Sequence, residues 1–128
     1  MSVIKADGYG HGAFRVAKTL TASNSFAVAR LEEAEDLRMA GLNSPVCVLE
    51  GVSSEQDFLR ARELGIQLVL HSWHQITLYK KYGPGVPIWL KIDSGMGRLG
   101  FAIHQCLEVL KRSNGLNLVG IVSHLSHA

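Results

Sequence analysis

The chain has few of the features that mark disulfide-rich, secreted or membrane proteins. Only 2 of its 128 residues are cysteines. Cys47 and Cys106 form no CxxC pair, so we expect free, reduced, structural thiols. No apolar run approaches the roughly 20 residues of a membrane span, and residues 1–20 lack the order of charged, apolar and small residues of a secretory signal. These absences favour a cytoplasmic protein without a membrane partner.

A strong charge of either sign is also absent. The formal net charge is +2, and the basic residues are scattered along the chain rather than clustered. We therefore expect no nucleic-acid partner. The 47% hydrophobic and 19% charged residues are typical of a globular protein, and 128 residues suffice for one domain with a single core.

Short apolar, β-rich runs alternate with helix-like segments along the whole chain. Most of the runs are apolar on both faces, as strands of a covered parallel sheet are. The expected strands are residues 3–4, 26–29, 46–49, 66–70, 87–92 and 118–122. The expected helices are 13–20, 31–40, 57–64, 74–82 and 105–112, with Ser53 or Ser54 as an N-cap and Gly41 and Gly65 at helix ends.

The ends of the first five runs recur about every 22 residues, which is the spacing of repeated βα units. Because parallel βαβ connections are right-handed, such units either close into a barrel or stack into an open doubly wound sheet. No GxGxxG sequence follows the first strand. We therefore predict an α/β fold, a partial TIM-type (β/α) barrel with about six of the usual eight βα units.

In both parallel architectures the active site lies beyond the carboxyl ends of the strands. The polar residues that follow the apolar runs are therefore the candidates for chemistry. These are residues 5–11, Arg30, Glu50, His71, residues 93–98 and residues 123–127.

Lys5 ends the first apolar run and precedes a stretch rich in glycine, residues 7–12. Beside apolar walls, a lysine favours its neutral amine, which can attack a carbonyl to form a Schiff base. A solvated lysine at a strand end is an equally good interpretation of the pattern. The glycines suit close backbone approach to an anion, which the free N–H groups of a following helix start would also contact.

Three further residues stand out near later strand ends. Lys91 lies within an apolar run, where it should be paired, neutral or chemically modified. Arg98 follows a glycine-rich turn, and its planar guanidinium suits a carboxylate or a phenolate-like oxygen, although a solvated loop arginine fits as well. His124 is a candidate proton carrier or orienting partner. His124 and His127 lack a third ligand nearby, so we predict no metal site.

Four segments in this order resemble the signature sequences of one enzyme family. They are VIKADGYGHG (3–12), PVCVLEG (45–51), LKIDSGMGRLGF (90–101) and VSHLSHA (122–128). The family is alanine racemase, a pyridoxal 5'-phosphate enzyme, and the resemblance lies in its amino-terminal barrel domain.

The resemblance implies a role for each matching residue. Lys5 would carry the cofactor and move a proton on one face of the substrate, and Tyr9 would contact the cofactor phosphate. Arg98 would lie near the ring hydroxyl and the substrate carboxylate, supported by a carbamylated Lys91. His124 would join the hydrogen-bond network around the ring. Leu49 would line the pocket.

The resemblance also implies that residues 1–128 are a truncated amino-terminal domain, without the carboxy-terminal β-domain whose tyrosine acts on the opposite substrate face. The parent protein would interconvert L-alanine and D-alanine, supplying D-alanine for cell-wall peptidoglycan, and would be a homodimer. The chain alone would be nearly inactive.

Three alternatives remain open from the sequence. The first is a non-catalytic barrel that binds pyridoxal phosphate, of the cofactor-homeostasis type. The second is a racemase of broader range that acts on serine or other small amino acids. The third is a (β/α) barrel that binds a sugar or phosphate, in which Lys5 only contacts phosphate.

Overall fold

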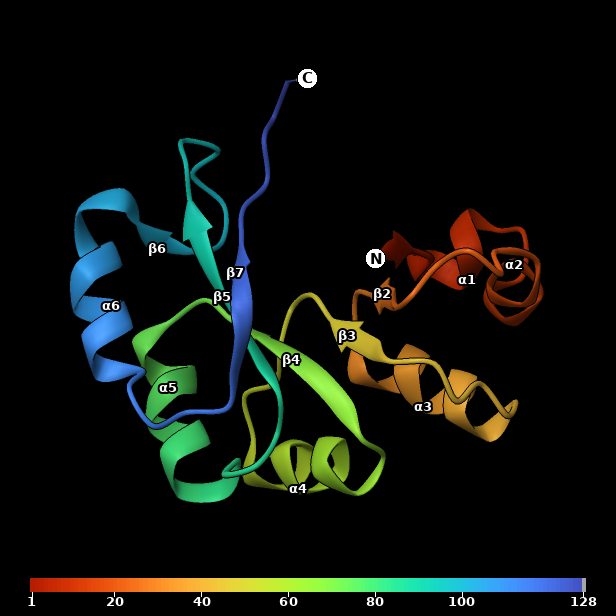
Figure 1. Cartoon of the computed structure of the whole chain (residues 1–128), viewed down its shortest axis with the longest axis horizontal. Coiled ribbons are helices and arrows are strands. Elements are labelled where there is room, and N and C mark those ends of the chain that lie inside the picture. The colour runs from red at the N-terminus through yellow and green to blue at the C-terminus, as the bar shows by residue number, and fades with distance from the viewer. Residues whose placement is uncertain (128) are drawn as a thin grey trace.

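The computed structural model describes residues 1–127, and its centre is a curled parallel sheet (Figure 1). Along the sheet the strands are β1 (Ser2–Val3), β2 (Phe26–Val28), β3 (Val46–Val48), β4 (Ile66–Leu70), β5 (Ile88–Asp93) and β7 (Leu118–Val122). Each strand pairs in parallel with the next one in this order. Strand order therefore follows chain order, as successive right-handed βα units in a barrel require.

Helices connect the strands and cover one face of the sheet. They are α2 (Ala13–Thr19), α3 (Leu31–Met39), α4 (Glu55–Glu63), α5 (Trp73–Tyr82) and α6 (Cys106–Arg112). Ser54, rather than Ser53, caps α4 by accepting a hydrogen bond from the Asp57 N–H at 3.1 Å. The predicted partial TIM-type barrel is confirmed, with strand and helix ends within about two residues of those expected from the hydrophobic pattern.

Two parts of the chain differ from the sequence prediction. Residues Lys5–Tyr9 form a short turn, α1, which is left-handed because Ala6, Asp7, Gly8 and Tyr9 all have positive φ. A two-residue strand, β6 (Phe101–Ala102), pairs with the end of β5 and leads into a 3₁₀ turn, η1 (Ile103–Gln105), before α6. Neither segment is long enough to show a hydrophobic period.

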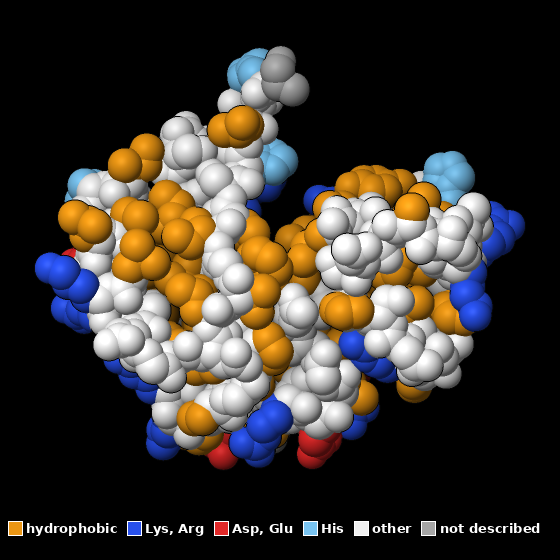
Figure 2. All heavy atoms as spheres, viewed as in Figure 1, with side chains coloured by type: hydrophobic (Ala, Val, Ile, Leu, Met, Phe, Trp, Pro, Cys, Tyr) orange, Lys and Arg blue, Asp and Glu red, His pale blue; other side chains and the backbone are white. Residues whose placement is uncertain are grey.

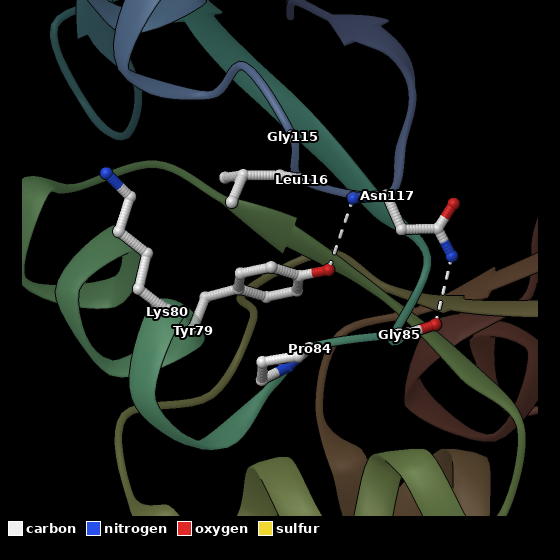
Figure 3. A pocket seen from close by; sticks show the side chains of 7 residues that line it. All are labelled: Tyr79, Lys80, Pro84, Gly85, Gly115, Leu116 and Asn117. Carbon is white, nitrogen blue, oxygen red and sulfur yellow. Dashed lines mark hydrogen bonds between the residues drawn. The ribbon is translucent and has the colours of Figure 1, made fainter.

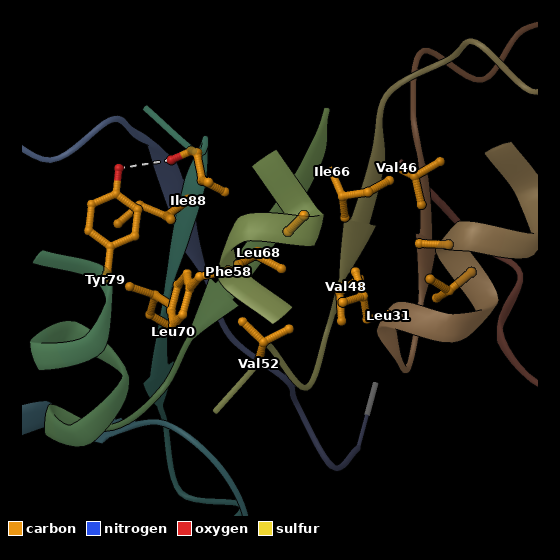
Figure 4. Packing of buried hydrophobic residues seen from close by; sticks show 14 of the residues in the cluster. Leu31, Val46, Val48, Val52, Phe58, Ile66, Leu68, Leu70, Tyr79 and Ile88 are labelled. Carbon is orange, nitrogen blue, oxygen red and sulfur yellow. Dashed lines mark hydrogen bonds between the residues drawn. The ribbon is translucent and has the colours of Figure 1, made fainter. Parts of the chain in front are cut away.

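The main core lies between the sheet and the helices, because alternate strand side chains point to the helix side. Figure 4 shows this packing from α3 across to α5. The residues labelled there are Leu31, Val46, Val48, Val52, Phe58, Ile66, Leu68, Leu70, Tyr79 and Ile88, all at most 7% exposed. The intervening strand residues therefore face the inside of the curl.

A smaller cluster occupies that inner face. Ala27, Cys47 and Val69 are buried there, with Leu49 and Trp89 packed against them. The Trp89 indole Nε1 donates to the Gln67 side-chain Oε1 at 2.8 Å, so its polar atom is satisfied. Hydrophobic side chains also remain visible in the notch between β7 and α1 (Figure 2). Among residues 1–127, no helix is both long and apolar enough to cross a bilayer.

Tyr79 on α5 contacts the loops that precede β5 and β7, at the amino-terminal end of the sheet (Figure 3). Its ring is 2% exposed, and its hydroxyl donates to the Val86 carbonyl at 2.9 Å while it accepts from the Asn117 N–H at 3.3 Å. The Asn117 amide also donates to the Gly85 carbonyl at 2.9 Å. The residues shown in Figure 3 line a hollow of about 350 Å³. Tyr79 therefore ties α5 to the loops before β5 and β7.

We expect the substitution Tyr79→Phe to destabilise the fold by about 1–3 kcal/mol, because it leaves the buried Val86 carbonyl without its partner. Urea unfolding measures this loss. Tyr9→Phe is the matched control, since the Tyr9 side chain is exposed and its hydroxyl makes no hydrogen bond among residues 1–127. Equal stability of the two variants would contradict the assigned role of the Tyr79 hydroxyl.

Candidate active site

The alternation of strand side chains places the main candidates on the inner face of the curl. Ile4 is 1% exposed in the outer core and continues the β1 ladder by donating its N–H to the Ala27 carbonyl at 2.8 Å. The next residue, Lys5, begins the turn α1, is half-buried, and lies close enough to Lys91 for its charge to lower the pKa of that lysine. Lys91 alternates between buried Leu90 and Ile92. Both lysines lie at the carboxyl ends of their strands.

The turn α1 begins at Lys5 and takes the chain away from the sheet. Ala6 and Asp7 each have φ of 51°, and Tyr9 has φ of 54°. This backbone costs an L-residue about 1–2 kcal/mol per position, so other contacts must hold it. The Asp7 carboxylate accepts from the Ala13 N–H at 2.8 Å. That contact occupies the first N–H of α2, one of the N–H groups expected to be free at this helix start.

Glu33 in the first turn of α3 holds the other side of α1. Its carboxylate accepts hydrogen bonds from the N–H groups of Ala6 at 2.6 Å, Ala29 at 2.7 Å and Arg30 at 3.0 Å. The sequence predicted the helix but not this residue. An acidic residue in a first helical turn was the available signal, and the contact with Ala6 spans 27 positions.

The loop after β5 is folded around the Asp93 carboxylate. Its oxygens accept from the N–H groups of Gly95 at 2.9 Å and Gly97 at 2.9 Å and 3.1 Å. These backbone hydrogen bonds, that of Gly95 first, lower the pKa of the Asp93 carboxyl. Ser123 secures the loop to the end of β7, since its hydroxyl lies 2.7 Å from that of Ser94 and donates to the Ile92 carbonyl at 2.8 Å.

This loop brings Arg98 to the carboxyl ends of β5 and β7. Lys91, Arg98 and His124 line one small hollow there. Burial lowers the pKa of Lys91, and the nearby positive charges of Arg98 and Lys5 lower it further against the opposing charge of Asp93. The cationic side chains of Lys5, Lys91 and Arg98 therefore share this region with the Asp93 carboxylate, whose oxygens already accept hydrogen bonds from backbone N–H groups.

A second group of predicted residues follows the ends of β2, β3 and β4. The His71 Nε2 is 3.0 Å from the Glu50 carbonyl, and the buried Gln75 amide donates to the same carbonyl at 3.2 Å. The Gln75 side-chain oxygen accepts from the His71 N–H at 2.8 Å. Arg30 and Glu50 form an exposed ion pair at 3.8 Å. Residues predicted from three separate strand ends thus meet at one end of the sheet.

The remaining candidates take different positions. Leu49 packs on the inner cluster, as a pocket-lining residue would. Tyr9 is 60% exposed at the end of α1. Burial raises the pKa of the Cys47 thiol to about 12, and both cysteines are free. In the described part of the chain, no three His, Cys, Asp or Glu side chains gather into a metal-binding group.

The structure is thus a partial (β/α) barrel. Lys5 follows the first strand, and Lys91, Arg98 and His124 line a hollow at the carboxyl ends of β5 and β7. The sequence profile described as "Alanine racemase, N-terminal domain" matches residues 1–128. The chain belongs to this family.

Individual relatives agree with the family assignment. The alanine racemase of Nitrosococcus oceani is 42% identical over 134 aligned positions, covering 100% of this chain and 38% of that protein. The alanine racemase structure from Acinetobacter baumannii superimposes with a TM-score of 0.91 at 33% identity, covering 99% of this chain and 37% of that one. The structure of the Bartonella henselae enzyme, described with covalently bound pyridoxal phosphate, gives a TM-score of 0.82 at 29% identity over 98% and 39% of the two chains. The present chain thus spans under two-fifths of the length of these relatives.

Gly100 is where the backbone after the Arg98 loop passes closest to β5. A Cβ atom there would lie 2.6 Å from the Asp93 nitrogen, and φ is +132°. We expect Gly100→Ala to lower the free energy of unfolding by about 1–3 kcal/mol beyond the cost of its backbone conformation, because β5 cannot move aside.

Gly95→Ala is the control, since Gly95 has a nearly equal φ of +127° but an added Cβ would meet nothing within 4 Å. Urea unfolding of both variants separates the close approach from the backbone strain. If the two substitutions cost the same, the approach of Gly100 to β5 does not constrain the loop.

Proposed function

We propose that the chain forms the cofactor-binding part of an alanine racemase, and that the full protein interconverts L-alanine and D-alanine. One observation carries this proposal: Lys5 lies close enough to Lys91 for its charge to lower the pKa of that residue, and Lys91 shares a hollow with Arg98. This proximity supports Lys5 as the amine that holds the cofactor, beside side chains that bind anions.

The charges of this region suit pyridoxal 5'-phosphate. The cofactor is anionic through its phosphate and ring hydroxyl, and the substrate adds a carboxylate. Lys5 and Arg98 supply positive charge, and Lys91 does so only in its unmodified form, while Asp93 is the carboxylate acting on Lys91. The related structure from Bartonella henselae supports the choice of cofactor, since that enzyme is described with pyridoxal phosphate covalently bound.

The resemblance to alanine racemase supplies the proposed role of each residue. Lys5 holds the cofactor through its amine and transfers a proton at the substrate Cα on one face. Arg98 binds the ring hydroxyl and the substrate carboxylate, and its planar guanidinium suits both. His124 orients the ring through a hydrogen bond, Leu49 lines the pocket, and Tyr9 binds the phosphate. Bound pyridoxal phosphate supplies the electron sink that makes a carbanion at Cα accessible.

Lys91 is proposed to be carbamylated. Its lowered pKa raises the fraction of neutral amine, which is the form that reacts with CO₂. The ammonium first loses one proton to solvent to give the neutral amine. The amine nitrogen then forms a bond to the CO₂ carbon and releases a second proton, so that a cation becomes an anion. The carbamate then pairs with Arg98, replacing repulsion between two positive charges by attraction.

Residues 1–128 are accordingly proposed as the amino-terminal domain, with the second base supplied by another part of the full protein. A homodimeric cytoplasmic enzyme that provides D-alanine for peptidoglycan is the setting proposed for it. The chain alone should show little or no racemisation, because racemisation needs proton transfer on both faces of Cα.

The first test is to trap the cofactor on the protein. The purified chain is incubated with pyridoxal phosphate and reduced with borohydride, and the modified lysine is identified by peptide mass spectrometry. We expect the label at Lys5, its loss in Lys5→Ala, and its retention in Lys80→Ala, where an exposed lysine on α5 is removed.

Label spread evenly over surface lysines would contradict the assignment of Lys5. Unchanged cofactor affinity in Lys5→Ala would instead favour a barrel that binds only the phosphate. Labelling of Lys5 together with no racemisation by the full-length protein would favour a non-catalytic cofactor-binding protein. A substrate panel on the full-length protein then distinguishes alanine from serine.

Carbamylation has its own test. In the presence of ¹³C-bicarbonate, we expect a carbamate carbon signal that is absent from Lys91→Gln and present in Lys80→Gln. The signal should grow as the pH rises through the lowered pKa of Lys91, because only the neutral amine reacts. Persistence of the signal in Lys91→Gln would show that another amine carries the modification.

A further inference from the structure

We propose that Glu33 is a positioning residue for Lys5: its carboxylate fixes the left-handed turn that follows the lysine and so directs the lysine amine into the site. This inference rests on the proposed function, because it assigns Glu33 a part in placing the cofactor-binding amine. Glu33 touches neither Lys5's amine nor the hollow lined by Lys91. It acts through the backbone of Ala6.

The hydrogen bonds of Glu33 join three parts of the chain. Oε1 accepts from the N–H of Ala6 at 2.6 Å, and Oε2 accepts from Ala29 at 2.7 Å and Arg30 at 3.0 Å. Ala6 is the residue after Lys5, so its N–H belongs to the peptide group that Lys5 begins. Holding this peptide group fixes the ψ angle of Lys5, and with it the direction in which the Lys5 side chain leaves the backbone.

The turn needs such a contact because its backbone is intrinsically unfavourable. Ala6, Asp7 and Tyr9 are all non-glycine residues with positive φ. In the absence of outside contacts, the three positions would favour ordinary right-handed or extended conformations. The Ala6 N–H is exposed, so water would readily replace Glu33 as its acceptor. Water would not fix the direction of the Ala6 peptide group.

Glu33 also connects the turn to a rigid part of the molecule. It lies in the first turn of α3, whose residues Leu31, Ala34 and Leu37 are at most 7% exposed in the main core. The N–H groups of Ala29 and Arg30 belong to the connection between β2 and α3. The position of the Ala6 peptide is therefore set by the core rather than by the surface loop.

The three hydrogen bonds that Glu33 accepts require two carboxylate oxygens and a side chain as long as that of glutamate. Three N–H groups converge on the two oxygens. In Glu33→Gln the amide has one oxygen, so its NH₂ group must face at least one of the three donors. In Glu33→Asp the negative charge stays in the first turn of α3, where it remains favourable, but the shorter side chain cannot reach Ala6 as well.

Two readouts on the present chain test the proposal. The first is amide hydrogen exchange of the segment from Lys5 to Gly12, and the second is the share of trapped pyridoxyl label that falls on Lys5. Loss of a hydrogen bond to a charged acceptor should raise exchange at Ala6 and lower the Lys5 share, each by about tenfold, in both Glu33→Gln and Glu33→Asp.

Two controls separate positioning from helix capping. Glu32→Gln removes the neighbouring exposed carboxylate, which makes no hydrogen bond among residues 1–127. Ser54→Ala removes the cap of α4 and should lower the melting temperature. Neither control should change exchange at Ala6 or the Lys5 share. Glu33→Asp keeps the charge at the start of α3, so it tests the turn even if Glu33→Gln folds poorly.

The outcomes are distinct. Unchanged exchange in both Glu33 variants, or faster exchange with an unchanged Lys5 share, would overturn the proposal. A lower melting temperature alone, as in Ser54→Ala, would show that Glu33 only caps α3 and would also overturn it. Absence of label on Lys5 in the unsubstituted chain would count against the proposed function instead, and exchange at Ala6 would then decide whether Glu33 holds the turn.

Discussion

The two-residue alternation of side chains along covered parallel strands is the constraint on which the rest of the structure depends. Outward residues such as Leu68 and Leu90 meet the helices and form the main core. Inward residues at the strand ends are consequently left for chemistry, and Leu49 and Lys91 are among them. A shift of β5 by one residue would bury Lys91 under a helix and turn Leu90 inward. The register of the strands thus determines both which residues form the core and which residues face the site.

Most of the fold was predictable because it depends on local hydrophobic patterns. The long strand at Ile66–Leu70 and the helix at Leu31–Met39 have enough residues to show their period, and glycine follows that helix where predicted. The turn α1 was not predictable, since Ala6, Asp7 and Tyr9 do not favour positive φ on their own. The hydrogen bond of Ala6 to Glu33, 27 positions away, helps to hold that conformation, as does the bond of Asp7 to the N–H of Ala13.

The candidate site was only partly accessible from the sequence. The position of Lys5 after an apolar run indicated a strand end, but a solvated lysine would have shown the same pattern. Resemblance of whole segments to alanine racemase supplied the roles of Tyr9, Arg98 and His124, and the family assignment is confirmed. The electrostatic relation between Lys91, Arg98 and Lys5 depends on a fold that joins residues more than 80 positions apart, so no local pattern could show it.

The buried Cys47 has a consequence for which group an aldehyde would encounter. Thiols as well as amines add to aldehydes, and Cys47 lies on the inner face of the sheet. With a pKa of about 12, the Cys47 thiol remains protonated near neutral pH and is packed among Ala27 and Val69. For the aldehyde cofactor proposed above, this packing leaves amines rather than the Cys47 thiol open to addition.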